Sequence, residues 1–127
     1  MARFQMQMDT AHPVMFLADS APIISVPPDT SAAFVTTTHD CLAFWVLSYV
    51  DGASIITIAD EACDAGGSLL FFGSINASSG VLTLSDSSNF AYINIPVPPG
   101  RIDIHVWAED NQHPEWVWLQ LSAIRPI

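Results

Sequence analysis

The sequence contains no lysine, and its only basic residues are Arg3, Arg101 and Arg125. The sequence has 13 acidic residues, so the formal net charge is −10 at pH 7. A surface of this charge repels phosphate backbones, which argues against nucleic acid as a partner. The same field favours a basic protein partner, although acidity also serves simply to keep an apolar protein soluble.

Long apolar runs are missing too. Half of the residues are hydrophobic and 13% are charged, yet no stretch approaches the roughly 18 apolar residues of a membrane span. The first twelve residues alternate polar with apolar and lack the hydrophobic region of a secretory signal. We therefore expect one domain, residues 1–127, without a membrane and in the cytoplasm. The two cysteines, Cys41 and Cys63, are expected to be reduced there.

No amphipathic helical segment of ten residues appears, and only residues 59–67 have a helical leaning, which is compatible with a single helical turn. Short apolar or alternating runs recur instead, separated by clusters of turn formers. We expect strands over residues 4–8, 14–18, 23–26, 32–37, 42–50, 54–58, 69–75, 81–84, 90–95, 101–108 and 116–123. About ten short strands at this spacing predict a single-domain antiparallel β-sandwich.

Residues 42–50, LAFWVLSYV, are almost continuously apolar. Such a run is typical of a central strand covered on both faces. Asp51-Gly52 follows it, and this dipeptide favours the positive φ angles of a tight hairpin turn. The pattern predicts that residues 54–58 return as the antiparallel partner of 42–50.

The stretch Gly100–Ile124 carries three of the four tryptophans and predicts a hairpin around the loop 109–114. Side chains alternate between two faces of a strand. The aliphatic face holds Ile102, Ile104, Val106, Ala108, Val117, Leu119, Leu121 and Ala123. The second face holds Arg101, Asp103, His105, Trp107, Trp116, Trp118, Gln120 and Ser122.

This alternation also restricts the register. Pairing Ala108 with Glu115 would place Trp107 opposite Trp116 and His105 opposite Trp118. A slip of one residue would mix the two faces, so the pattern excludes it, whereas a slip of two preserves the faces and stays open.

The aromatic second face has two interpretations. A loop or another sheet covers the indoles and their N–H groups find partners. Alternatively, Trp107, Trp116 and Trp118 form an open binding platform beside His105 and Asp103.

Candidate chemistry is sparse. Asp103 and His105 lie two apart on one strand and share a face, so a carboxylate could orient an imidazole base or share a metal. No third ligand lies at local spacing, and most such pairs are ordinary surface residues. The acidic turn of Asp60, Glu61 and Asp64 does not match an EF-hand loop. We expect no catalytic residue, metal or cofactor.

The last third of the chain resembles a known group of proteins. The resemblance rests on Ile93-Asn94-Ile95-Pro96, the Pro99-Gly100 turn, the strand Ile102–Trp107, the acidic loop and the Pro114-Glu115 restart before Trp116–Leu121. These about 35 residues resemble the C-terminal half of small bacterial β-sandwich proteins, the competence protein J-like nuclease inhibitors and immunity-type proteins. Those relatives often have an aromatic residue where this chain has Ile102. The resemblance implies a non-enzymatic protein that neutralises a partner such as a basic nuclease or toxin.

The sequence thus favours an acidic, non-enzymatic binding protein. Its expected contact residues are Trp107, Trp116, Trp118, His105 and Asp103 on the strands, with Glu109 and Asp110 in the loop. Three alternatives stay open: a carbohydrate-binding module that stacks sugars on the tryptophans, a homo-oligomer that buries the aromatic face, and a metal-dependent enzyme around Asp103 and His105.

Overall fold

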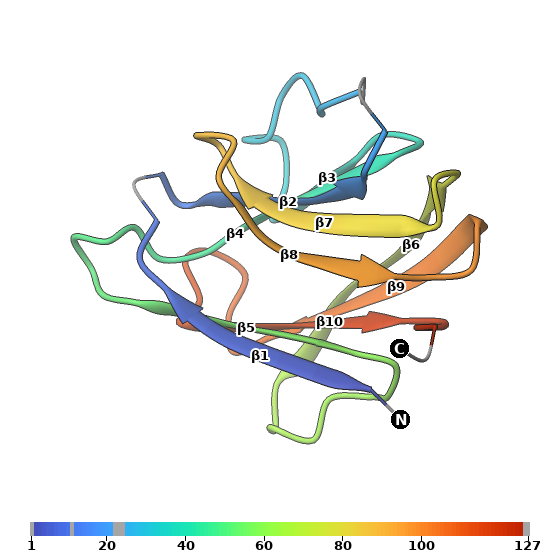
Figure 1. Cartoon of the computed structure of the whole chain (residues 1–127). Helices are drawn as coiled ribbons and strands as arrows, with labels where there is room; N and C mark the ends of the chain where they lie inside the picture. The colour runs from blue at the N-terminus through green and yellow to red at the C-terminus, as the bar shows by residue number, and fades with distance from the viewer. Residues whose placement is uncertain (1, 11, 22–24, 126–127) are drawn as a thin grey trace.

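The computed structural model describes residues 2–10, 12–21 and 25–125, which form ten strands packed as two sheets (Figure 1). The strands are β1 (Arg3–Met8), β2 (Val14–Asp19), β3 (Val35–Thr37), β4 (Cys41–Trp45), β5 (Ser54–Ala59), β6 (Ser68–Ala77), β7 (Val81–Asp86), β8 (Ala91–Pro96), β9 (Gly100–Ala108) and β10 (Trp116–Leu121). Sheet A has the order β1-β5-β10-β9-β6, and sheet B has the order β3-β4-β2-β7-β8. The predicted single-domain β-sandwich is therefore confirmed.

The described residues contain no helix, and so none long and apolar enough to cross a membrane. The sequence is compatible with a helical turn within residues 59–67, but the structure has none there, because the positions after Ala59 are irregular. Half of the strand expected over residues 23–26 falls outside the described residues, and its other half, Ser25 and Val26, is irregular. The strand expected over 32–37 is shorter, since β3 covers only Val35–Thr37.

The core lies between the two sheets and is built from alternating residues, as the sequence pattern predicts. Sheet B contributes fully buried side chains from its central strands, among them Met15, Leu17, Leu42, Phe44, Leu82 and Leu84. Sheet A contributes the aliphatic face of β9 and β10, namely Ile102, Ile104, Val106, Ala108, Val117, Leu119 and Leu121. Burial of these apolar surfaces is the main stabilising term of such a fold.

One strand pair departs from the antiparallel expectation, because β5 and β10 run parallel, with Val117 beside Ile56. The β4–β5 connection departs as well: β4 belongs to sheet B and β5 to sheet A, so residues 42–50 and 54–58 do not form a hairpin. The chain leaves β4 at Trp45, where Val46 N–H donates to Pro13 and Tyr49 N–H donates to Thr10. These bonds to the β1–β2 loop replace the ladder bonds that a longer β4 would need.

Residues 42–50 were predicted to form a strand that is covered on both faces, and this is confirmed for the part of them that lies in β4. Cys41, Leu42, Ala43 and Phe44 are all buried. Leu42 and Phe44 face the core, while the β2–β3 connector lies across the opposite face, where Trp45 Nε1 donates to Thr30 O at 2.9 Å. Burial and the neighbouring Asp40 charge raise the pKa of the Cys41 thiol to about 12.

The faces of the final hairpin are as predicted, and its register is shifted by two residues. Trp118 lies opposite Trp107, and Gln120 lies opposite His105. The loop is longer than expected, since Ala108 pairs with Val117 and leaves Trp116 beside Ile55 of β5. A two-residue shift keeps every side chain on its face, which is why alternation alone could not exclude it.

Candidate functional site

Five of the predicted site residues, on β9 and β10, share the outer face of sheet A, and a segment crosses part of that face. Residues 60–67 connect β5 to β6, and both strands run in the same direction with β10 and β9 between them. We call this segment the β5–β6 crossover. It must therefore return across the sheet, and it does so over the tryptophans.

Trp118 lies beneath the crossover and is only 3% exposed. Its Nε1 donates to Glu61 O at 3.0 Å. The Arg3 guanidinium lies 4.6 Å from the indole centroid and also pairs with Glu61 and Asp64 of the crossover. The open-platform interpretation is thus wrong for Trp118, whose N–H and ring are both occupied within the fold.

The other two tryptophans are half-buried. Trp107 Nε1 donates to Gln120 Oε1 at 3.1 Å, which satisfies its polar edge on the sheet itself. Trp116 packs against Gly67, where an added Cβ would lie 2.2 Å from Trp116 Cη2. The crossover therefore fits closely over Trp116 and leaves no flat aromatic platform across the three rings.

Asp103 and His105 also have partners within the sheet. Asp103 Oδ1 accepts from Arg101 Nε at 3.0 Å. The His105 ring lies 4.4 Å from the ring of Phe72, an exposed residue of the edge strand β6. Across residues 2–10, 12–21 and 25–125, no three histidine, cysteine, aspartate or glutamate side chains come together as metal ligands.

Glu109 and Asp110 occupy a different place, the loop between β9 and β10 at one end of the sandwich. Both are exposed, and both carboxylates stabilise the loop. Glu109 Oε1 accepts from Glu115 N–H, and Asp110 Oδ1 accepts from Gln112 N–H at 2.9 Å. The structure therefore separates the predicted loop residues from most of the predicted aromatic face.

The same end of the sandwich gathers carboxylates from four connections. These are the β1–β2 loop, the β2–β3 connector, the β4–β5 loop and the β9–β10 loop, which all meet where β1 and β4 end and β5 and β10 begin. We call this region the acidic end, and its exposed carboxylates belong to Asp9, Asp29, Asp51, Glu109, Asp110 and Glu115.

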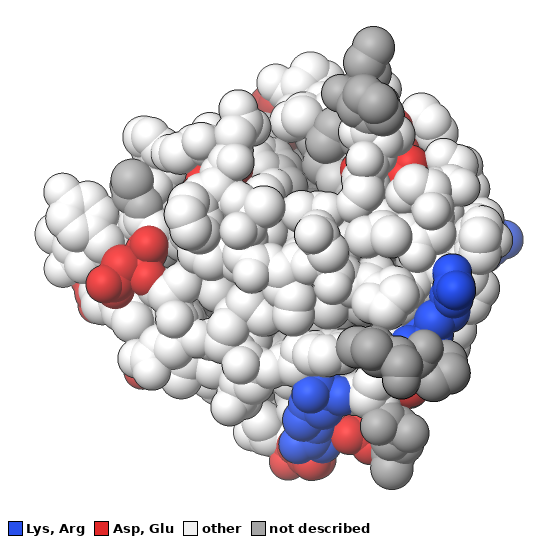
Figure 2. All heavy atoms as spheres, viewed as in Figure 1, with Lys and Arg blue, Asp and Glu red and all other residues white. Residues whose placement is uncertain are grey.

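All three arginines lie toward the opposite end. Arg3 begins β1 beside the last residue of β5, Arg101 is near the start of β9, and Arg125 N–H donates to Pro96 at the end of β8. In Figure 2 the basic side chains lie along the right and lower edges, the lower one beside acidic side chains, and a separate red patch at the left has no basic side chain near it. Because no described ion pair involves the carboxylates of the acidic end, their field is directed outward from this end.

Exposed apolar side chains accompany these charges. Tyr49 and Val50 form the tip of the β4–β5 loop and are 60% and 75% exposed. Phe90, in the β7–β8 loop, is 60% exposed and contacts Tyr92. Exposed aromatic residues within a charged surface are typical of protein-binding sites.

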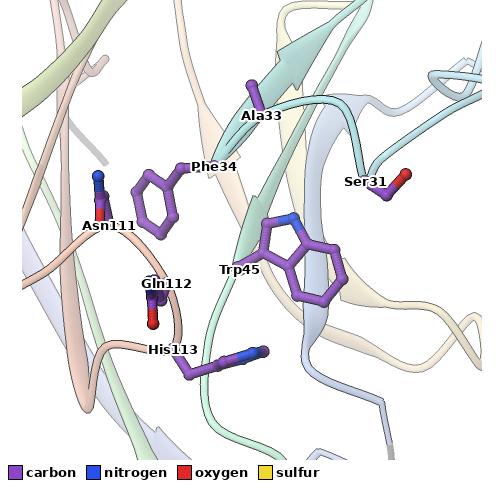
Figure 3. A pocket seen from close by; sticks show the side chains of 7 residues that line it. All are labelled: Ser31, Ala33, Phe34, Trp45, Asn111, Gln112 and His113. Atoms are coloured by element: carbon purple, nitrogen blue, oxygen red, sulfur yellow. The ribbon is translucent and has the colours of Figure 1, made fainter.

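A cavity of about 300 Å³ opens at the acidic end (Figure 3). One wall comes from sheet B and its connector: Ser31, Ala33, Phe34 and Trp45. The other wall is the β9–β10 loop of sheet A: Asn111, Gln112 and His113. The Trp45 and His113 rings meet edge to face with centroids 5.5 Å apart. The cavity therefore lies between a strand of sheet B and a loop of sheet A.

Sequence patterns miss most of this site. Glu109 and Asp110 stand out because they form an acidic pair within a turn, and both do lie at the acidic end. Phe34 and Trp45 resemble ordinary strand residues, and Tyr49 and Val50 continue an apolar run. Only the placement of the loops in space brings these residues together.

Comparisons with known proteins place the fold but no sequence family. No protein-family model matches the chain, and no curated protein matches it in sequence. ComJ from Bacillus subtilis, an inhibitor of the DNA degrading activity of NucA, matches in structure with a TM-score of 0.65 and 4% identity over 93% of both chains. The protein of crocagin biosynthetic gene J matches with a TM-score of 0.55 and 16% identity, over 94% of this chain and 98% of that one. The expected resemblance to competence protein J-like proteins is therefore confirmed at the level of the fold.

Proposed function

We propose that this chain is a non-enzymatic inhibitor that binds a basic protein, a nuclease or toxin, through its acidic end. The separation of charge carries the proposal, since the end without arginines bears exposed carboxylates and exposed aromatic side chains. The likeness in fold to ComJ, which inhibits a nuclease, supports the same class of function. Steering by such a field accelerates the encounter with a partner of opposite charge.

The first test measures DNA cleavage by a panel of basic bacterial nucleases while the protein is titrated in. We expect at least one nuclease to be inhibited with a sharp equivalence point at equal molar amounts. A basic protein without nuclease activity serves as competitor and should not relieve the inhibition. Activity that persists across the panel at large excess of this protein would contradict the nuclease proposal.

A charge-matched pair of variants tests the role of the acidic end. Glu109→Gln with Asp110→Asn keeps side-chain acceptors in the β9–β10 loop, and Glu61→Gln with Asp64→Asn changes the crossover instead. Each double variant changes the net charge from −10 to −8. Two carboxylates about 8 Å from a partner cation contribute about 1 kcal/mol in water, or about fivefold in association rate at low salt.

Stopped-flow association with the inhibited nuclease separates the two variants. The loop variant should associate about four- to fivefold more slowly at about 0.01 M salt and about twofold more slowly at 0.15 M, because screening shortens the range of the field. The crossover variant should stay within about 1.5-fold of wild type. Equal slowing of both variants would mean that only the total charge matters, contrary to the proposal.

Self-association is a second candidate, favoured by the edge strand β6. Leu69 and Phe72 of this strand are 46% and 57% exposed, and the strand carries no charged side chain. Uncharged edges with exposed apolar residues pair readily with other strands. Light scattering of wild type and Phe72→Ser over a range of concentrations tests this, and a monomeric wild type at high concentration would exclude it.

A further inference from the structure

Three hydrogen-bond donors that line the cavity at the acidic end already have partners within the protein. Trp45 Nε1 donates to Thr30 O at 2.9 Å, and Ser31 Oγ donates to Asp29 Oδ1 at 2.5 Å. His113 Nδ1 lies 3.3 Å from Val46 O, and a carbonyl can only accept, so Nδ1 carries the proton. The lone pairs of Ser31 Oγ stay available as acceptors.

The remaining lining groups add acceptors and aromatic surface. Asn111 and Gln112, in the β9–β10 loop, each offer an amide oxygen as acceptor beside an amide NH2 donor. The Phe34 and Trp45 rings stand on the opposite wall (Figure 3), and the bond to Thr30 fixes the indole. A ligand that matches these walls has a flat face for the rings and several donors for the acceptors.

Negative charge stands directly beside both walls. Asp29 precedes Ser31 and binds its N–H at 3.1 Å, and Asp110 precedes Gln112 and binds its N–H at 2.9 Å. The hydrogen bonds from Ser31 lower the pKa of Asp29, which keeps this carboxylate charged at neutral pH. The three arginines of the chain lie toward the other end, so none of them neutralises this cavity.

We propose that the cavity binds the guanidinium group of an arginine side chain. Guanidinium is planar, permanently charged and rich in donors, and it stacks on aromatic rings while binding oxygen acceptors at its edge. A lysine ammonium carries the same charge but no flat face and is more strongly hydrated. The volume of about 300 Å³ suits one long side chain.

Which protein carries the arginine rests on the proposed function, because the basic protein that this chain inhibits would supply it. In that complex the arginine would be an anchor residue at the acidic end, and such anchors carry a large part of the binding energy at interfaces. The site itself, however, can be tested without any partner.

The probe is N-acetyl-arginine amide, with N-acetyl-lysine amide as the matched cation and a neutral methyl glycoside as the third ligand. Binding is followed by ¹H–¹⁵N NMR of the four indole N–H signals, with that of Trp45 assigned from the variant Trp45→Phe. We expect saturable shifts of the Trp45 signal with the arginine probe and about two- to fivefold weaker binding of the lysine probe. The signal of Trp118, which lies beneath the crossover and outside the cavity, should not move.

The variant Phe34→Leu keeps apolar bulk and removes one of the two rings, so it should reduce the preference for arginine over lysine. Because Phe34 is partly buried against the core, the melting temperature should fall, by about 5 °C or less. Phe72→Leu removes an exposed ring outside the cavity and is the matched control, with unchanged probe binding. Equal affinity for the two cations in wild type, an unchanged preference in Phe34→Leu, or stronger binding of the glycoside would each overturn the proposal.

The same variants distinguish this proposal from the proposed function. If a nuclease is inhibited equally by wild type and Phe34→Leu, and the arginine probe does not bind, the cavity assignment fails and the inhibitor function stands. If the arginine probe binds at Trp45 while no nuclease is inhibited, the function fails and the guanidinium site stands. If both proposals hold, the affinity of the protein for the inhibited nuclease should fall about tenfold or more in Phe34→Leu.

Discussion

Replacing Asp19 with alanine should weaken the link between the two sheets. Asp19 ends β2 of sheet B and is only 4% exposed. Its carboxylate accepts hydrogen bonds from Ser78 Oγ at 3.0 Å, from Ser79 N–H at 3.1 Å and from Ser79 Oγ. These serines form the turn that leads from β6 of sheet A to β7 of sheet B, so one carboxylate joins the sheets at the end opposite the acidic end.

The size of the effect follows from what each donor can do without the carboxylate. A hydrogen bond to a charged acceptor contributes about 1.5–3 kcal/mol to stability. The three bonds do not add, because Ser78 and Ser79 are exposed and their hydroxyl groups can turn to water. Loss of the buried charge also removes its desolvation penalty. We therefore expect the free energy of unfolding to fall by about 2–3 kcal/mol, and the melting temperature by about 10 °C for a domain of this size.

Urea unfolding followed by tryptophan emission measures this loss. Asp29→Ala is the matched control, because Asp29 also accepts one N–H and one hydroxyl, both from Ser31, within a single exposed loop. Its unfolding midpoint should equal that of wild type. A loss below about 1 kcal/mol for Asp19→Ala, or equal losses for the two variants, would refute the view that Asp19 joins the sheets.

Three further predictions follow from the buried groups. Burial alone would raise the pKa of Asp19, but the hydrogen bonds from Ser79 and Ser78 lower this pKa below the ordinary 3.8. The stabilisation that Asp19 contributes is therefore complete above that pH and is lost as pH falls through the lower pKa of the folded state. The difference in urea midpoint between wild type and Asp19→Asn should accordingly be constant from pH 7 to 5 and shrink below about 3.8; shrinkage that begins near pH 6 would be inconsistent with this. Trp118→Phe should raise the fraction of tryptophan emission that acrylamide quenches, since it removes the 3% exposed indole, and an unchanged fraction would mean that the crossover does not cover it. A thiol reagent should modify the half-buried Cys63 of the native protein but not the fully buried Cys41, whose pKa burial raises to about 12, until urea exposes it; two reactive thiols in the native state would disagree.

The alternation of residues was enough to predict the two faces of the final hairpin. Ile102, Ile104 and Val106 are buried in the core, and Trp107 shares the outer face with Trp118, as period-two patterning requires. The same pattern could not place the strands relative to each other beyond multiples of two residues. The observed pairing of Ala108 with Val117 is the slip of two residues that the pattern left open, and the division into faces is as predicted.

The residues of a turn predicted less well which strands pair with each other. Gly52 does adopt a positive φ of 131°, as the Asp51-Gly52 dipeptide favours. The turn joins one sheet to the other instead of closing a hairpin, because the backbone of Val46 and Tyr49 bonds to the β1–β2 loop. A turn signal fixes local dihedral angles, and long-range contacts decide which strands pair.

By itself, the sequence determined the all-β sandwich, the composition of the core and the net charge of −10, because these depend on residue type and local alternation. Only the tertiary structure decided which outer surfaces are open. The β5–β6 crossover covers Trp118, and loops distant in sequence bring Asp29, Trp45 and Asp110 to one end. Such coverage depends on strand order and on the paths of crossovers, which alternation within a strand does not encode.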